Sequence, residues 1–339
     1  MAQINKPNQY FNTVLYTGNG STQSITGVGF QPDFVWMKQR NATNSHVVID
    51  SVRGVLKRIR PDETNAEDTL ANSLTAFGSD GFTLGSAQEV NDNSDTYASW
   101  NWLGSNTTAA NTDGSISSTV SANTTSGFSI VSYTGTGTHP STVGHGLGSV
   151  PKMIITKQRS AIQTWYIYNS NLGNNKVIEL NNANASYTDN TWSSTTPTSS
   201  VFTVGNNNVN GSGQTYIAYC FAEKQGFSKF GSYTGNGSAD GTFVYTGFKP
   251  AWLMIKKSSA TENWLVLDNK RDIDNTVQNT LLANTNNSEF TGTDRVDFLS
   301  NGFKCRTATG GLNDSGTFIY MAFAENPLVG TNNIPATAR

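Results

Sequence analysis

The sequence predicts an all-β protein built from three tandem β-sandwich or jelly-roll units of about 100 residues each. Three observations lead to this prediction. Ser, Thr and Asn make up about a third of the 339 residues and Gly adds 32 more, which suits short strands and turns better than helices. Short apolar runs recur between turn signals, and one five-residue motif occurs three times.

The repeated motif is YTGNG at Tyr16, which returns as YTGTG at Tyr133 and as YTGNG at Tyr233. A proline follows each copy, and similar residues then stand at fixed distances from that proline. The prolines are Pro32, Pro151 and Pro250; a lysine stands six residues later (Lys38, Lys157, Lys256), a ring fourteen later (His46, Trp165, Trp264), and Asp50, Asn169 or Asp268 eighteen later. These offsets predict three units, at residues 1–104, 105–225 and 226–339.

Each unit is expected to contain the same strands in the same order. The runs after the prolines, FVWMK, MIITK and WLMIK, are apolar at successive positions and predict strands covered on both faces. HVVID, WYIYN and WLVLD predict the next strand after a short loop, and the aromatic runs at 96–102, 215–221 and 317–323 predict a closing strand. The best helix candidate is 63–76, although its Thr and Asn content disfavours a helix.

The connections between units differ in length. Residues 104–126 contain almost no large apolar side chain, and they are predicted to be a linker between the first two units. Only 222–226 separates the second unit from the third, so these two are expected to pack closely. The tail at 326–339 is expected to be an extended segment that becomes ordered only against a neighbour.

Composition excludes several classes of protein. Only 14% of residues are charged and the net charge is −2, which gives no attraction to nucleic acid. No apolar stretch is long enough to insert in a membrane, and the N-terminus lacks the pattern of a signal peptide. Cys220 and Cys305 stand in apolar runs and are predicted to be buried thiols. No cofactor is expected.

The sequence offers no catalytic pattern, and we expect no enzyme activity. Asp50 and Asp268 recur with Arg53 and Arg271 three residues later, but the middle unit has Asn169 and Leu172 there. A structural Asp–Arg contact in a turn accounts for this pattern better than a pair of glycosidase carboxylates.

The three histidines and the recurring lysines are also weighed against structural roles. His46 occupies the ring position of the other units and is expected to be packed, whereas His139 and His145 are expected to be solvated in a glycine-rich loop, with no metal site. In a hairpin, each lysine would lie near the ring eight residues later. We therefore hypothesise cation–π contacts of Lys157 with Trp165 and of Lys256 with Trp264.

Exposed tryptophans are the candidates for contact with sugars. Trp192 lies in the polar run 187–200 and has no counterpart in the other units, so it is the leading candidate. Trp165 and Trp264 are the further candidates. Loops rich in Ser, Asn and Gly would supply hydrogen bonds around such a ring.

The repeated segments resemble a family of proteins from marine bacteriophages, including phages of cyanobacteria. The resemblance covers about residues 10–328 and rests on runs such as YTGNGSTQSITGVGFQPDFVWMKQRN, VGHGLGSVPKMIITKQR and VYTGFKPAW. Members are described as virion structural or tail-fibre-like proteins, and the resemblance implies a lectin-like sandwich fold. It implies no catalytic residues.

These observations lead to one expected function and two alternatives. We expect a virion structural protein, a tail-fibre or tip module that attaches to host-surface glycan, with three weak sites acting together. It would assemble in the host cytoplasm, contact other virion proteins and form a homo-oligomer, with a trimer as the expected form. The first alternative is a capsid decoration or head-fibre protein docked through 2–9 and the C-terminal tail. The second, a depolymerase, would need a carboxylate pair.

Overall fold

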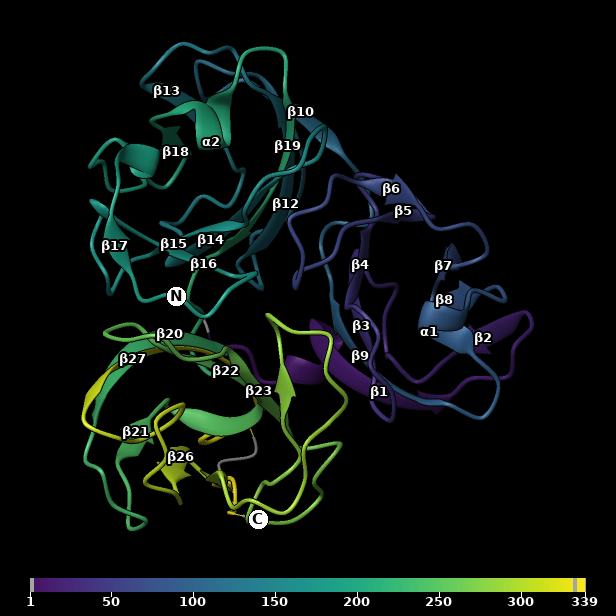
Figure 1. Ribbon diagram of the computed structural model, residues 1–339, viewed down its shortest axis with the longest axis vertical. Coiled ribbons are helices and arrows are strands. Elements are labelled where there is room, and N and C mark those ends of the chain that lie inside the picture. Colours follow the sequence, from purple (N-terminus) through teal and green to yellow (C-terminus); the bar gives the residue numbers. More distant parts are fainter. Residues whose placement is uncertain (1–2, 332–333, 339) are drawn as a thin grey trace.

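The computed structural model describes residues 3–331 and 334–338, and its regular structure is almost entirely antiparallel β-sheet (Figure 1). We call 3–104 the first region, 105–225 the second and 226–338 the third. Figure 1 shows them as three lobes, blue, teal and green to yellow, arranged around a common centre. None of the helices in the described residues is long and apolar enough to span a membrane.

The first region places a four-stranded sheet against a three-stranded one. Their facing side chains form an apolar cluster that includes Val35, Met37 and Phe82. The large sheet has the order β1 (Phe11–Thr17), β9 (Thr96–Trp102), β3 (Phe34–Gln39), β4 (Val47–Asp50), and the small sheet has the order β2 (Gln23–Ile25), β8 (Gly81–Leu84), β7 (Leu74–Gly78). The remaining elements are η1 (Pro7–Gln9), β5 (Lys57–Arg58), β6 (Asp68–Thr69) and α1 (Gln88–Asn91).

The second region repeats this strand order within a longer sheet. β12, β19, β14 and β15 follow one another as β1, β9, β3 and β4 do, and additional strands extend both edges. The large sheet consists of β10 (Ala109–Asn111), β11 (Ser118–Asn123), β12 (Phe128–Thr134), β19 (Thr215–Phe221), β14 (Met153–Gln158), β15 (Tyr166–Asn169), β16 (Lys176–Glu179) and β17 (Tyr187–Thr188). The facing strands are β13 (Ser141–Gly144) and β18 (Val201–Val204), with η2 (Asn190–Trp192) and α2 (Asn207–Asn210) in loops.

The third region has the same arrangement again. Its large sheet is β20 (Ser228–Gly235), β27 (Gly316–Pro327), β22 (Phe248–Lys257), β23 (Leu265–Asp268) and β24 (Leu281–Leu282). Its small sheet is β21 (Phe243–Tyr245), β26 (Gly302–Cys305) and β25 (Val296–Leu299). The apolar cluster between these two sheets includes Leu253, Phe303 and the buried thiol of Cys305.

Two predictions, one about the linker and one about a helix, are wrong. Residues 104–126 are not a bare linker, because β11 pairs with β12 along its whole length and β10 pairs with β11. Serine and threonine are compatible with a strand when their neighbours pair with it, so apolar content alone underestimated this segment. The helix candidate at 63–76 instead contains β6 and part of β7.

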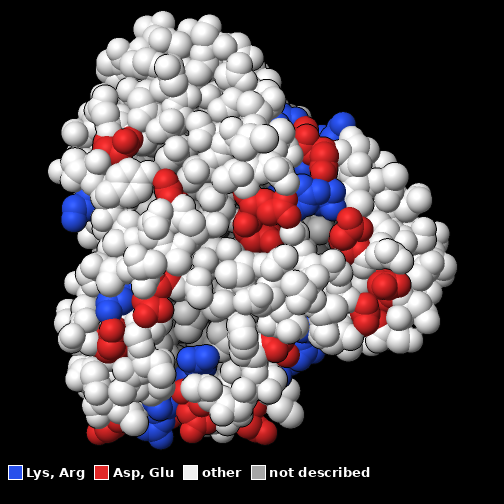
Figure 2. Space-filling view, viewed as in Figure 1, with Lys and Arg blue, Asp and Glu red and all other residues white. Residues whose placement is uncertain are grey.

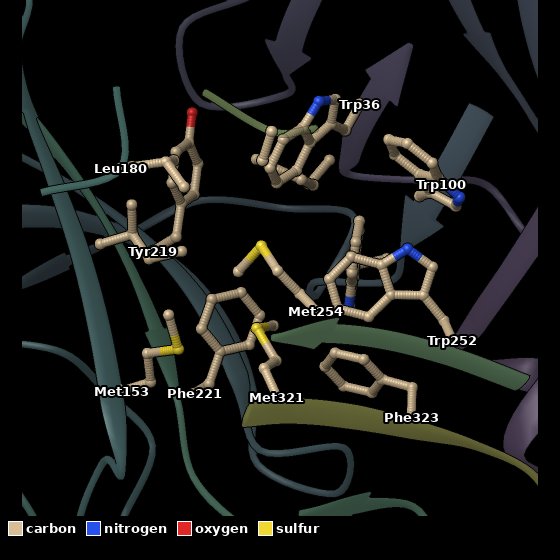
Figure 3. Packing of buried hydrophobic residues seen from close by; sticks show 14 of the residues in the cluster. Trp36, Trp100, Met153, Leu180, Tyr219, Phe221, Trp252, Met254, Met321 and Phe323 are labelled. Carbon is tan, nitrogen blue, oxygen red and sulfur yellow. The ribbon is translucent and has the colours of Figure 1, made fainter. Parts of the chain in front are cut away.

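In each region, the face of the large sheet that points away from the small sheet packs into one core that all three regions share, as Figure 3 shows. Successive residues of β3 alternate between two cores: Phe34 and Trp36 point into the shared core, and Val35 and Met37 into the core of the first region. This confirms that the strand is covered on both faces. Ring contacts cross between all three regions: Phe34–Tyr219 at 4.5 Å, Phe11–Phe323 at 5.0 Å and Phe221–Phe323 at 6.2 Å between ring centroids.

Candidate functional site

All three recurring lysines are buried. Lys157 and Lys256 bond to a neighbouring region, whereas Lys38 Nζ donates to carbonyls of its own region, those of Gln39 and Ala42. Lys157 Nζ donates hydrogen bonds to the carbonyl oxygen of Thr64, in the first region, at 3.0 Å and to that of Gln163 at 2.7 Å. Lys256 Nζ likewise reaches back to the carbonyl of Ala183, in the second region, at 3.2 Å. Burial lowers the pKa of each lysine, including Lys38, to about 8.

The hypothesis of cation–π contacts with the following rings is wrong. Among the described residues the cation–π contacts are those of Lys257 with Phe318 and of Arg271 with Trp100. The ammonium groups of Lys157 and Lys256 are instead directed to carbonyl oxygens, which satisfy buried N–H donors better than a ring face does.

The rings fourteen residues after the recurring prolines, His46, Trp165 and Trp264, link the three regions in a closed cycle. Trp165 Nε1, in the second region, donates to the carbonyls of Arg60 and Glu63 in the first, at 2.9 and 3.1 Å. Trp264 Nε1, in the third region, donates to the Glu179 carbonyl in the second, at 2.8 Å. His46, in the first region, contacts the Leu282 carbonyl in the third through Nε2 at 2.9 Å. Each region is therefore anchored to its neighbour by one ring, and the cycle closes.

His46 is a packed ring, as the sequence predicted. Its Nδ1 accepts a hydrogen bond from Trp36 Nε1 at 2.8 Å, while Nε2 faces a carbonyl and must carry the proton. Burial lowers the pKa of His46 to about 3, and the positive charge of Lys38 adds to this. The ring is therefore neutral at ordinary pH and acts as a hydrogen-bonding bridge.

The Asp–Arg pairs are buried turn contacts that also receive a bond from a neighbouring region. Arg271 Nε pairs with Asp268 Oδ2 at 2.6 Å, and Trp100 Nε1, from the first region, donates to the same oxygen at 3.1 Å. Arg53 pairs with Asp50 in the same way, and the Tyr219 hydroxyl, from the second region, donates to Asp50 Oδ2 at 2.7 Å. These carboxylates hold the junction together.

Two ion-pair chains extend these contacts, and sequence reasoning missed them. Arg159 binds Glu67 across the seam between the first and second regions, at 2.9 Å. Arg40 binds Glu289 across the seam between the first and third regions, at 2.7 Å. Each glutamate also binds the buried arginine of its Asp–Arg pair, Arg53 at 3.2 Å or Arg271 at 2.9 Å. Figure 2 shows few charges over most of this face, with several gathered where the first and second regions adjoin.

The arginines had a sequence signal and the glutamates had none. Arg40 and Arg159 both stand two residues after the recurring lysine, where the third region has Ser258. Glu67 stands 14 residues after Arg53, and Glu289 stands 18 residues after Arg271. Because these two distances differ, no fixed offset could identify the glutamates.

The seam between the second and third regions has no Asp–Arg pair among the described residues, and its ion pair, Lys229–Glu223 at 2.7 Å, is partly exposed. Asn169 and Leu172 replace the Asp–Arg pair, and Met321 stands where the other regions present Trp100 and Tyr219. The buried Asn169 Nδ2 has no hydrogen-bond partner among the described residues. Backbone contact remains, because the N–H of Ser186 donates to the Ser258 carbonyl at 2.9 Å.

The predicted glycan contacts are wrong. Trp192, Trp165 and Trp264 are each 1% exposed, so none offers a ring face to a sugar. Trp192 belongs to η2, whose start is capped by Asp189, and its ring packs on Tyr168 at 6.0 Å inside the core of the second region. The polar residues around Trp192 in the sequence thus form a surface loop, and the buried Trp192 ring fixes that loop on the core.

The remaining predicted groups divide between surface and core. His139 is exposed, as expected, but His145 is fully buried and contacts the Thr198 carbonyl at 3.2 Å, so its predicted solvation is wrong. Cys220 and Cys305 are buried thiols, which confirms their prediction, and burial raises the pKa of both. No group of three His, Cys, Asp or Glu suited to a metal occurs among residues 3–331 and 334–338.

Comparison with known proteins gives one result. A family model described as a domain of unknown function (DUF7483) matches residues 6–327, which is nearly the whole chain. No curated protein and no solved structure matches.

Proposed function

We propose that this chain, which belongs to the family described as a domain of unknown function (DUF7483), is a bacteriophage structural protein that serves as a tail-fibre or tip module for attachment to host-surface glycan. The phage setting comes from the resemblance of the repeated motifs. The observation that supports a structural role is the closed junction, in which buried rings, lysines and ion pairs are used to join three regions.

We also infer that the three regions are copies of one β-sandwich unit. The recurring strand order and the equivalent placement of Lys38, Lys157 and Lys256 support this inference. Three such units around a common centre form one body with three surfaces that face outward. Such a body suits a protein that must bind a surface at several points without its units moving apart.

The alternative, a capsid decoration protein, depends on free terminal segments. The described part of the N-terminal arm is held by the body of the protein instead. Ile4 is buried in the shared core, and its N–H donates to the Gln225 carbonyl at 3.1 Å. Gln3 Nε2 contacts the Val329 carbonyl, at the start of the C-terminal tail, at 2.6 Å. We therefore favour a role in the virion tail over decoration of the capsid.

Immunogold labelling of intact virions with an antibody against this chain tests the proposal. Label at the tail is the expected result. Label spread over the head would overturn the tail assignment in favour of decoration, and absence of label from the particle would overturn the structural role. Light scattering of the purified chain would test the expected trimer separately.

A further inference from the structure

The third region carries a surface hollow of ≈ 320 Å³ that combines an exposed ring with polar groups. Phe290 lies at this hollow and is 43% exposed, whereas most aromatic side chains of the protein are buried. Its backbone is fixed, because Phe290 and Thr280 exchange both hydrogen bonds of an antiparallel bridge, each at 2.9 Å. The ring is therefore presented to solvent by a rigid support.

Two charged side chains at the hollow have unused hydrogen-bonding capacity. Within residues 3–331 and 334–338, the Glu262 carboxylate makes no hydrogen bond and no ion pair, although its charge acts on Lys256 and opposes the lowering of that lysine's pKa. Arg295 is half-buried and donates through Nε to Thr280 Oγ1 at 3.2 Å, and in the same described residues its terminal nitrogens have no partner. Asn263 accepts from Asn284 Nδ2 through Oδ1, so its own amide N–H groups are available.

A pair of glycines makes room for the carboxylate. A Cβ on Gly310 would lie 2.4 Å from Glu262 Oε1, and one on Gly311 would lie 3.6 Å from Oε2. Both glycines line the hollow. The carboxylate thus rests against bare backbone, a position that a larger residue at 310 would take away.

The equivalent positions in the other regions differ in a way that singles out the third. Thr280 and Phe290 correspond by strand pairing to Val177 and Tyr187 in the second region. Tyr187 is 37% exposed, but its hydroxyl donates to Glu179 Oε1 at 2.7 Å. The first region has Asp68 at this position, bound to Arg58.

We propose that this hollow binds one pyranose ring of a glycan, with the C–H face of the sugar on Phe290 and its hydroxyls bonded to Glu262, Asn263 and Arg295. A pyranose has an apolar face that a ring can cover and an edge of hydroxyls that both donate and accept. Charged partners give the stronger hydrogen bonds to such hydroxyls. This inference rests on the proposed attachment function and names its site.

Saturation-transfer NMR on the whole chain tests the site. The probes are the methyl glycosides of β-galactose, β-glucose, α-mannose and β-glucuronic acid. We expect saturation to pass from the protein to the ring C–H protons of at least one probe. Phe290→Ala should reduce that transfer at least tenfold, and Glu262→Gln should weaken it.

Phe243→Ala is the matched control, because Phe243 is a phenylalanine of the same region that is 46% exposed and lies on β21, outside the hollow. It should leave the transfer unchanged. Near-ultraviolet circular dichroism of each variant checks that the fold is intact. Transfer from none of the four glycosides, or equal transfer in Phe290→Ala, overturns the site.

Failure here is distinct from failure of the proposed function. Tail label on virions combined with no saccharide transfer overturns the hollow alone. Saccharide transfer combined with absence of label from the particle leaves a sugar-binding protein and overturns the phage role.

Discussion

Replacing Arg271 with leucine, the residue that the second region has at the equivalent position, should strongly destabilise the protein. Arg271 and Asp268 are both fully buried, and Arg271 also binds Glu289 and the Val266 carbonyl at 2.8 Å. Arg271→Leu leaves the Asp268 carboxylate buried without its cation. Breaking a buried pair from one side costs about 3–5 kcal/mol.

The double variant Asp268→Asn/Arg271→Leu should recover much of this loss. It reproduces the natural Asn169/Leu172 pair, and an asparagine oxygen can still accept from Trp100 Nε1, which now binds Asp268 at 3.1 Å. Glu289 keeps Arg40 as a partner. Since the two residues touch, we expect a coupling free energy of about 1–3 kcal/mol.

Urea unfolding at pH 7, followed by circular dichroism, measures Arg271→Leu, Asp268→Asn and the double variant against wild type. The slope with urea should stay constant, so that the midpoint reports the free energy of unfolding. The reasoning is refuted if Arg271→Leu costs less than about 1 kcal/mol, or if the double variant loses the sum of the two single losses.

Three further predictions follow from burial. Trp192→Ala should lower the free energy of unfolding by about 3–5 kcal/mol, because the ring fills a core; a loss below about 1 kcal/mol in urea unfolding would contradict its burial. The folded-state pKa of His46, about 3, lies below its unfolded value near 6.5, so the unfolded chain binds the extra proton between these values. Wild-type stability should therefore fall with decreasing pH by up to about 1.4 kcal/mol per unit more than that of His46→Gln, and parallel pH profiles would count against this. The folded-state pKa of Lys157, about 8, is likewise below its unfolded value near 10.4. From pH 8 to 10, the wild type should therefore gain stability relative to Lys157→Met, by up to about 1.4 kcal/mol per pH unit. A constant difference in stability between the two proteins would contradict the lowered pKa.

The sequence predicted positions well and predicted their partners poorly. Fixed offsets identified the positions of Lys157, Trp165 and Asp268 as three recurring positions, and the structure places all three residues at contacts between regions. Lys157 and Trp165 bind carbonyls of another region, such as that of Thr64, and a carbonyl leaves no mark on residue identity. A pattern can therefore show that a position matters without showing what it touches.

The candidate binding rings were misjudged for a related reason. Trp192 was favoured because its neighbours are polar, yet one large ring under a polar loop is a common way to fix that loop on a core. Phe290, in the run NNSEFTG, lies in an equally polar setting and is exposed. What separates the two is the backbone: η2 turns Trp192 inward, whereas the bridge with Thr280 holds Phe290 at an edge. Local composition does not encode that difference.

The three seams differ in their ion pairs. Among the described residues, the seam between the second and third regions has a partly exposed ion pair, Lys229–Glu223, and no buried Asp–Arg pair. The other two seams each carry a buried Asp–Arg pair and a bridging glutamate. The length of the connections does not account for this difference, because β9 and β10 are joined by 103–108 and β19 and β20 by 222–227, six residues in each case. Buried charge penalises any misplaced partner, which gives the two seams with buried pairs a defined register.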